Sequence, residues 1–536
     1  MLFVIVSAAL HCLAYRSVLV NASLDSQVTL GIVHDSERTH LPPEWAQPPS
    51  SDATGRLIFN SISSLPLRWP NTMWKNGHTI APAKVPVGTM LYHGTYVSDG
   101  TAPTESGWLG FDPEVGYLYC GNPCRVASYV ATRELKVLYF DGLSAAKVPN
   151  SSYFETQDLL SWGSIRHDRI FWELERLKVL CDWGREFSID GFVRMQAEFE
   201  LMHCDFTDGI EMIELADLPP QFPILLSGHG QPPRPPGWKG ELVTGTQTFV
   251  EAFLSGQRHD QLPGEARVRI SFDGIISFYD PALSSLTEAR RGKSRAHHNL
   301  QDISQDDIST TLQELRSVLT RNGRGSGVDW PAIFQGVYDR YADRLQLLNL
   351  TLGSADATLE HMTNARQLIL ALLVHHMAPT DVPSPGQSDI SWMSPVVERC
   401  SRSPVTHVKD TLFSPQERLL RGAVEETLHE ICRRLGLMWV EAFDIESAGV
   451  AQRHAVALRW RAHIHELLRW LDWQQFNRCV PGCAAGEMCY ISMDPYPWPE
   501  DAPDNTTPRC VSQNYNVWPS YDSAQLEGSD ILLQGL

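Results

Sequence analysis

The chain changes character once, near residue 300, and this change constrains its fold more than any other feature. Before it, short strand-like runs are bounded by turn residues. From Ser304 the apolar residues recur at helical spacing almost to the end, which predicts an all-α bundle. We therefore expect an α+β fold, with a mixed α/β domain over 81–285, a helical domain over 300–476 and a small tail over 477–536.

The first domain should contain a few short strands and helices. A helix should begin at Asp112 as N-cap with Pro113 at its first position, and an amphipathic helical region should follow over 155–187. The runs that predict strands are Thr89–His93, Leu135–Phe140, Phe199–Phe206 and two strands flanking the Asp273-Gly274 turn within Arg267–Pro281. We expect an irregular lead-in over 18–80 and a Pro-rich surface loop over 218–240.

Five segments of the second domain have wide apolar faces at helical spacing. Ser414-Pro415-Gln416-Glu417 adds an N-cap, a proline at the first helical position and an acidic first turn. The predicted helices are Asp307–Arg321, Trp330–Leu350, Ala355–Met377, Pro415–Phe443 and Gly449–Phe476.

The tail contains four cysteines in a short, polar, Pro-rich stretch. Such a stretch has little core of its own, so two disulfides are expected, among three available pairings of Cys479, Cys483, Cys489 and Cys510. A zinc site is the alternative, but the spacing lacks paired C-x-x-C motifs, and we expect no metal. Cys120 and Cys124 would close a tight loop. The other four cysteines, Cys181, Cys204, Cys400 and Cys432, would pair or remain buried thiols.

The N-terminus predicts secretion. Residues 1–17 begin with a short apolar segment followed by polar sequence, as in a signal peptide; a buried N-terminal strand is the alternative. Ten cysteines remain beyond it, an even set, and sequons for N-glycosylation occur at Asn21, Asn150, Asn349 and Asn505. No later run of about 18 apolar residues predicts a membrane span.

The net charge argues against polyanionic partners. The formal charge is -19 at pH 7, and no cluster of Lys and Arg occurs that would bind a nucleic acid or an anionic membrane. A small nucleotide remains compatible with this charge, and a protein partner is not identified by the sequence.

Two residues in the strand-like region have chemistry suited to a site. His93 ends a strand beside Gly94, where a ligand could approach the backbone. Glu200 opens a later strand, and a carboxylate there could stabilise positive charge at a breaking glycosidic bond. Taken singly, each residue is more often structural.

The order of the pieces between Val87 and Phe206 resembles the ADP-ribosyltransferase fold, in its diphtheria-toxin-like and poly(ADP-ribose)-polymerase-like branch. The matching pieces are His93-Gly94-Thr95, the segment G-W-L-G-F-D-P-E-V-G-Y-L-Y-C and I-D-G-F-V followed by A-E-F-E-L-M. The resemblance implies NAD as substrate, with His93, Gly94 and Thr95 binding it and Trp108, or Phe111, and Tyr119 stacking on nicotinamide. It implies Glu200 as the residue that stabilises the transition state, with Glu198 second, and it places His93 beside Glu200 among the catalytic residues. Trp-Leu stands where the family usually has Tyr followed by Phe.

The chain as a whole also resembles an uncharacterised family of predicted secreted fungal proteins. The shared phrases are L-Y-F-D-G-L-S-A-A-K, D-G-F-V-R-M, S-F-Y-D-P, D-R-Y-A-D-R-L and the cysteine tail. This resemblance implies no chemistry.

Two other function classes compete with NAD cleavage. One is a non-catalytic extracellular structural or interaction protein, in which His93 and Glu200 lie apart or are covered. The other is a secreted hydrolase, which needs two carboxylates facing each other across a groove. Local acid pairs suited to that role are Asp112 with Glu114 and Asp205 with Asp208.

A separate motif, Glu426-x-x-His429 on a predicted helix, has the spacing of a di-iron ligand pair.

Overall fold

The structure is a computed structural model. It describes residues 44–95, 103–120, 124–148, 151–195, 198–218, 236, 259–321, 325–353, 358–383, 389–479, 481–485, 487–490 and 508–512. The predicted signal peptide, the sequons at Asn21, Asn150 and Asn505 and nearly all of the Pro-rich stretch 218–240 lie outside these residues. Within the described part, no helix has the length and apolar character needed to cross a membrane.

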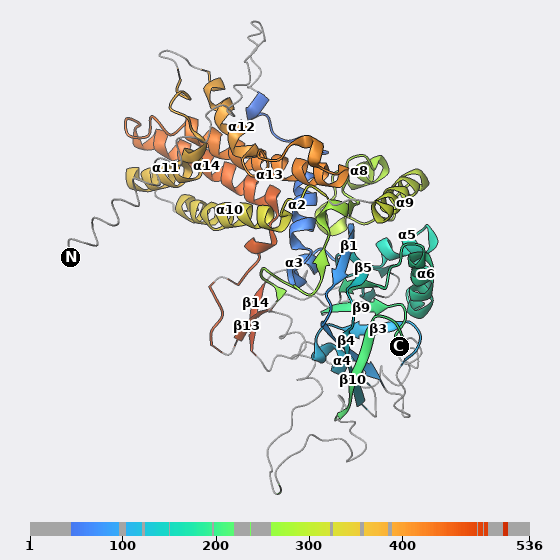
Figure 1. Cartoon of the computed structure of the whole chain (residues 1–536). Coiled ribbons are helices and arrows are strands. Elements are labelled where there is room, and N and C mark those ends of the chain that lie inside the picture. Colours follow the sequence, from blue (N-terminus) through green and yellow to red (C-terminus); the bar gives the residue numbers. More distant parts are fainter. Residues whose placement is uncertain are drawn as a thin grey trace, which may run out of the picture. The chain divides into compact units, whose positions relative to one another are not determined.

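One large mixed sheet organises the first half of the chain (Figure 1). Its strands are β1 (Thr79–Val85), β2 (Met90–Thr95), β3 (Gly107–Gly110), β4 (Cys124–Ala131), β5 (Leu135–Phe140), β8 (Gly191–Met195), β9 (Phe199–His203), β10 (Ile210–Leu218), β11 (Arg269–Ile270) and β12 (Ile276–Ser277). The order is β10-β4-β2-β3-β9-β8-β5-β1-β11, and β12 also pairs with β1. The β5 and β8 strands are parallel, and the other ladders are antiparallel.

Successive residues of the central strands enter two different apolar cores, because side chains alternate between the faces of a sheet. We call the side of Leu91, Leu109 and Leu201 the first face, and the side of Met202 and Phe192 the second face. All five residues are buried. Burial on both faces explains why every residue of β8 and β9 is buried and why their apolar residues do not strictly alternate with polar ones.

The second face is covered by four helices. These are α5 (Glu155–Trp162), α6 (Glu173–Arg185), α8 (Ser284–Arg290) and α9 (Gln305–Thr320). Leucines of α5, α6 and α8 pack here with Met202 and Phe192 of the sheet. The N-cap of α9 is Ser304, whose side chain accepts a hydrogen bond from the backbone N–H of Asp307.

The apolar core of the first face continues into the C-terminal helices. These are α10 (Trp330–Gly353), α11 (Leu359–Leu373), α12 (Ser394–Arg402), α13 (Pro415–Val440) and α14 (Val450–Leu471), and Figure 1 shows them together. The five predicted helices correspond to α9, α10, α11, α13 and α14. The N-cap predicted at Ser414 is confirmed, and it forms a capping box, since Ser414 and Glu417 each bind the other's backbone N–H.

The prediction of an irregular lead-in over 18–80 is wrong for its described part from residue 55 on. That part forms α2 (Gly55–Ser64), α3 (Arg68–Thr72) and the start of β1. Every residue of α2 except Arg56 is buried. Its polar residues are buried with its apolar ones, and Asn60 and Ser63 form hydrogen bonds with Leu471 O and with the Tyr338 hydroxyl group.

Strands flank the Asp273-Gly274 turn on both sides, as predicted, and both return to the sheet of the first domain. The turn itself is a short 3-10 turn, and the two strands do not pair with each other. Both β11 and β12 pair with β1, at its two ends. Strand propensity correctly located the strands, but the partner depends on a segment about 190 residues earlier in the chain, which local patterns do not encode.

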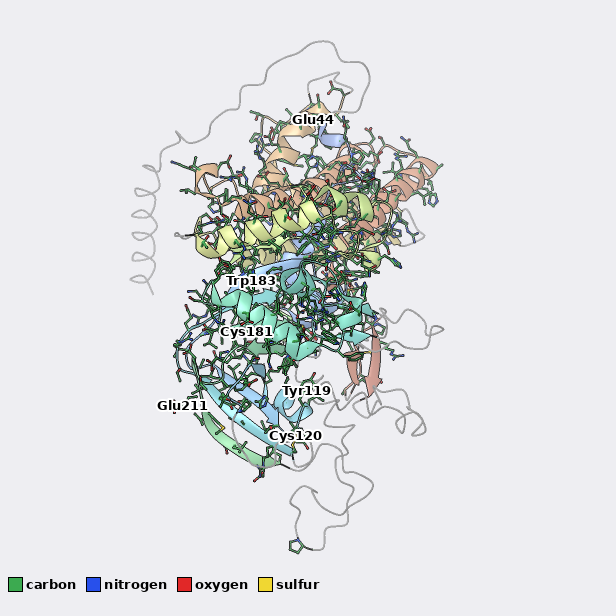
Figure 2. All side chains as sticks on the ribbon, turned by 90° about the vertical axis from the view of Figure 1, so that its right-hand side faces the viewer. Glu44, Tyr119, Cys120, Cys181, Trp183 and Glu211 are labelled. Carbon is green, nitrogen blue, oxygen red and sulfur yellow. A yellow bond between two sulfur atoms is a disulfide. The ribbon has the colours of Figure 1, made fainter. Side chains whose placement is uncertain are left out.

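Five disulfides join the ten cysteines beyond Cys12, which agrees with the even count (Figure 2 labels Cys120 and Cys181). The pairs are Cys120–Cys124, Cys181–Cys204, Cys400–Cys432, Cys479–Cys489 and Cys483–Cys510. In the tail they join the segments of a two-stranded ladder, β13 (Glu487–Tyr490) and β14 (Arg509–Ser512). Of the two alternatives for the tail, disulfides are therefore the one that forms.

Candidate functional site

His93 lies in β2, and its imidazole is turned into the protein. Its Nδ1 is 2.8 Å from the backbone carbonyl oxygen of Trp108, and its ring contacts Phe206 edge-on at 5.4 Å between centroids. Burial lowers the pKa of His93, although the hydrogen bond to Trp108 opposes this effect. Because a carbonyl only accepts, Nδ1 carries the proton of the neutral ring.

The register of the ladders places His93 and Glu200 on opposite faces of the sheet. Tyr92 of β2 is opposite Gly110 of β3, and Gly110 is opposite Glu200 of β9. Directly opposed residues point to the same face, so Tyr92 and Glu200 share the second face. His93 is the next residue after Tyr92 and therefore points to the first face, as Leu91 does.

Glu200 is held by an arginine of the neighbouring strand. Arg194 of β8 is directly opposite Glu200 of β9, and its Nε donates a hydrogen bond of 2.5 Å to Glu200 Oε1. The same guanidinium donates from Nη1 to Glu173 Oε2 at 2.9 Å. All three side chains are buried. The carboxylate of Glu200 is thus engaged by protein rather than directed at an open cleft.

The ionic contacts continue beyond Arg194. Arg176 is fully buried, donates to Asp158 at 3.1 Å and to Glu173 at 3.4 Å, and lies over the ring of Phe154. We refer to Asp158, Glu173, Arg176, Arg194 and Glu200 together as the Glu200 network. It joins α5 and α6 to strands β8 and β9 on the second face.

The charge state of the Glu200 network follows from its contacts. Burial alone would lower the pKa of Arg194, but the carboxylates of Glu173 and Glu200 outweigh it and raise that pKa. Burial raises the pKa of Asp158, although Arg176 opposes this effect. The guanidinium of Arg194 therefore stays charged, and it is the counter-ion of the buried carboxylates of Glu173 and Glu200.

The residues next to His93 are covered by the protein's own backbone. A Cβ atom on Gly94 would lie 2.1 Å from the carbonyl oxygen of Gly116 in α4 (Pro113–Leu118) and 2.7 Å from the backbone nitrogen of Cys120. The glycine thus permits α4 to approach the backbone of β2. The helix occupies the place where a ligand was expected to approach. Thr95, the third residue of the motif, is buried and opposite Arg125 in β4.

The predicted stacking residues do not meet around His93. Trp108 lies on the second face and packs beside α5 and α6, whereas His93 points to the first face. Phe111, the other candidate, is fully buried, and Tyr119 is 36% exposed just after α4. Glu198, the second choice for the catalytic residue, is buried with its Oε1 4.0 Å from Arg68 Nη1.

A second buried polar cluster, missed by the sequence analysis, lies at the start of α4. Asp112 is the predicted N-cap, but its side chain makes no capping bond and instead pairs with Arg267 at 3.0 Å. Arg267 also binds Glu265 at 2.5 Å, and His259 lies 3.5 Å from Asp112 and 3.4 Å from Glu265. We call these four residues the Asp112 cluster. No local motif links residues so far apart in the chain.

The acid pairs considered for a hydrolase have other partners. Asp112 is bound to Arg267 rather than facing Glu114. Asp208 pairs with Arg133 at 2.6 Å, and Asp205 accepts the backbone N–H of Thr207 at 2.8 Å within its own turn.

The di-iron spacing at Glu426-x-x-His429 has a structural explanation. Burial raises the pKa of Glu426, and hydrogen bonds from the backbone N–H groups of Gly55 and Arg56 oppose this effect. The carboxylate therefore caps the first turn of α2.

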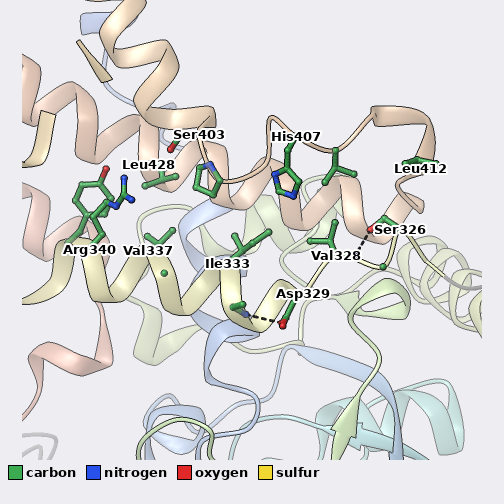
Figure 3. A pocket seen from close by; sticks show the side chains of 16 residues that line it. Ser326, Val328, Asp329, Ile333, Val337, Arg340, Ser403, His407, Leu412 and Leu428 are labelled. Atoms are coloured by element: carbon green, nitrogen blue, oxygen red, sulfur yellow. Dashed lines mark hydrogen bonds between the residues drawn. The ribbon is translucent and has the colours of Figure 1, made fainter. Parts of the chain in front are cut away.

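A groove of about 730 Å³ lies between α10 and the segment joining α12 to α13 (Figure 3). Its walls are mainly apolar, with Val328, Ile333 and Val337 on one side and Leu428 of α13 on the other. Among its 16 lining residues, Asp329 carries the one carboxylate. The groove therefore does not hold the facing carboxylate pair that glycoside hydrolysis requires.

Asn349 is the one sequon asparagine within the described residues. It lies inside α10, half-buried, and its Oδ1 is buried without a hydrogen-bond partner among the described residues. The following Thr351 donates its hydroxyl hydrogen to Leu347 O within the same helix. This position differs from the exposed loop that a sequon in a secreted protein usually occupies.

Comparisons with known proteins locate the shared part of the chain. The family described as the YPL277C N-terminal domain matches residues 120–226. The uncharacterised protein YOR389W of Saccharomyces cerevisiae is 27% identical over 30% of this chain and 33% of its own length. The uncharacterised protein YPL277C of the same yeast is 27% identical over 30% of this chain and 42% of its own length. No solved structure matches.

These likenesses support a relation to uncharacterised fungal proteins, as the sequence phrases predicted. The matched regions span less than half the length of the two yeast proteins. The matched family segment contains the whole Glu200 network but begins after His93 and Trp108.

Proposed function

We propose that this chain is an extracellular, disulfide-stabilised structural or interaction protein that does not cleave NAD. The proposal is the non-catalytic alternative of the sequence analysis. It keeps the predicted secretion, which is supported by the apolar N-terminal segment and by the pairing of all ten cysteines beyond it.

The observation that carries the proposal is the position of Glu200 relative to His93. The resemblance to the ADP-ribosyltransferase fold implies a site in which the carboxylate lies beside the ribose while a histidine of the first strand binds the same nucleotide. Here the two side chains point to opposite faces of one sheet. A molecule the size of NAD cannot contact both without passing through the sheet.

The electrostatics support the same conclusion. A carboxylate stabilises an oxocarbenium-like transition state through its negative charge, and this effect is strongest when no other cation neutralises it. Glu200 already has Arg194 as a buried counter-ion at 2.5 Å. Breaking this pair to accept a substrate would leave a buried charge unpaired.

The experiment is a calorimetric titration of NAD into the purified full-length chain, prepared from a secreting host with its disulfides intact. The proposal predicts no binding heat for wild type or for Glu211→Gln, a matched control whose side chain is exposed on β10 (Figure 2). Saturable binding of NAD that is lost in Glu200→Gln but kept in Glu211→Gln would contradict it. The ADP-ribosyltransferase reading stays a prediction, and that second outcome would support it.

Secretion is tested separately, by expressing the full-length chain. The proposal predicts that the protein is recovered from the culture medium and that residues 1–17 have been cleaved from it. Retention of the folded protein inside the cell when residues 1–17 are present would overturn the extracellular part of the proposal.

A further inference from the structure

The Asp112 cluster brings together three side chains whose donor atoms suit a transition metal. Asp112 precedes α4, whereas His259 and Glu265 come from the segment that leads into β11. One ligand atom from each of these three residues lies within 4.8 Å of the other two, and all three residues are buried. Two carboxylates and an imidazole are ordinary zinc ligands.

The separations between these atoms fit ligands arranged around a common ion. His259 Nε2 is 3.5 Å from Asp112 Oδ2 and 3.4 Å from Glu265 Oε2. Both distances are longer than those of most hydrogen bonds, about 2.7–3.2 Å, although the imidazole does form a hydrogen bond with Asp112. Two ligands of a tetrahedral zinc ion, each bonded at about 2.0–2.1 Å, stand about 3.4 Å apart.

The charges around the cluster also call for a cation. Four carboxylates meet here, those of Asp112, Glu198, Asp260 and Glu265, and two guanidiniums face them, those of Arg68 and Arg267. Burial alone would lower the pKa of His259, but its hydrogen bond to Asp112 and the charges of Glu265 and Glu198 outweigh this effect and raise that pKa. Buried charges are normally paired or bound to metals, and these carboxylates outnumber the guanidiniums, so a divalent cation would stabilise the cluster.

We propose that Asp112, His259 and Glu265 form a binding site for a zinc-class divalent cation that ties the start of α4 to the segment before β11. The imidazole selects against Ca²⁺ and Mg²⁺, which prefer oxygen ligands. The site goes beyond the proposed function and does not depend on it.

Arg267 is the competitor for this site. Its Nη2 contacts both Asp112 and Glu265, so the guanidinium bridges the two carboxylates that the cation would bridge. The Arg267 side chain is 31% exposed, so this competing cation reaches the protein surface, although it also donates to the carbonyl oxygen of Phe111. A bound divalent cation therefore displaces the guanidinium from between the carboxylates, and removing Arg267 should strengthen metal binding.

The test is a titration of Zn²⁺ into metal-stripped, full-length protein without reductant, followed by metal analysis after dialysis. Wild type should retain one equivalent, His259→Ala should bind at least about tenfold more weakly, and Arg267→Met should bind more tightly. The control is His297→Ala, whose exposed ring contacts Ser294 at 2.8 Å away from the cluster. Mn²⁺ and Ca²⁺ are titrated in parallel, with Zn²⁺ expected to bind most tightly.

Two outcomes would overturn the site. One is that wild type retains no equivalent of Zn²⁺, which would leave the guanidiniums of Arg68 and Arg267 as the counter-ions of these carboxylates. The other is equal binding by wild type and His259→Ala, which would place the metal elsewhere. If His259→Ala fails to fold, Glu265→Gln keeps the test open, because it removes one anionic ligand oxygen while preserving the side chain's size.

Discussion

Arg194 and Glu200 lie directly opposite each other on neighbouring strands and share a buried hydrogen bond of 2.5 Å. This contact changes the interpretation of Glu200. The carboxylate of Glu200 is already neutralised by Arg194, and it is enclosed between the sheet and α6. The same contact makes a clear prediction about stability.

Arg194→Met should destabilise the fold by about 3–5 kcal/mol, because it leaves Glu173 and Glu200 buried without their shared cation. Denaturant unfolding measures the change. Arg185→Met is the matched control, since Arg185 forms an exposed pair with Asp182 and its loss should have no measurable effect. Equal stabilities of the two variants would show that the Glu200 network contributes nothing.

The double variant Arg194→Met/Glu200→Gln should be less destabilised than the sum of the two single variants. Glutamine removes the charge that Arg194→Met leaves unpaired. Strict additivity in the same unfolding assay would mean that the two side chains are not energetically coupled.

Gly94→Ala should destabilise the protein by about 1–3 kcal/mol, because the new methyl group would meet the backbone of α4 at 2.1 Å from Gly116 O. Gly422→Ala in α13 is the control. Its Cβ would have no neighbour within 4 Å, and alanine favours the helix, so a gain of about 0.4–1 kcal/mol is expected. A Gly94→Ala protein as stable as wild type would indicate that α4 does not cover β2.

The disulfides should differ in their contributions according to the loops they close. Cys400–Cys432 closes a loop of sequence separation 32 between α12 and α13, and Cys120–Cys124 closes one of separation 4. Replacing the first pair with alanines should cost about 3–4 kcal/mol and the second about 2 kcal/mol. The reverse order in denaturant unfolding would contradict this expectation.

Stability should depend on pH through Glu155. Burial raises the pKa of Glu155 from 4.5 to about 7, although the backbone N–H of Leu300 opposes this effect. Between pH 4.5 and about pH 7 the folded state therefore binds more protons at Glu155 than the unfolded state does. The contribution of Glu155 to the free energy of unfolding falls as pH rises through this range. Glu155→Gln should gain stability relative to wild type as pH rises from 4.5 to about 7. Parallel curves for the two proteins would rule out this contribution.

Local patterns located many elements well. The strand Leu135–Phe140 and the helix begun by Asp112-Pro113 were predicted within a residue or two, and Ser414 does cap α13. These features depend on turn residues, caps and short periodicities that lie within a few residues of one another.

The site could not be predicted in the same way. Whether His93 and Glu200 share a face depends on the pairing of β2, β3 and β9, and a shift of one residue reverses the result. Arg194 lies only six residues before Glu200, yet nothing in the sequence shows that the two are opposed across a ladder. The Asp112 cluster joins residues separated by about 150 positions, beyond the reach of any local motif.

The most direct test of the central claim is nicotinamide release from NAD by the purified chain, measured beside Glu200→Gln. The account predicts no release from either protein, together with a lower unfolding free energy for the variant. Release by wild type that disappears in a folded Glu200→Gln protein would contradict the account and make Glu200 a catalytic residue.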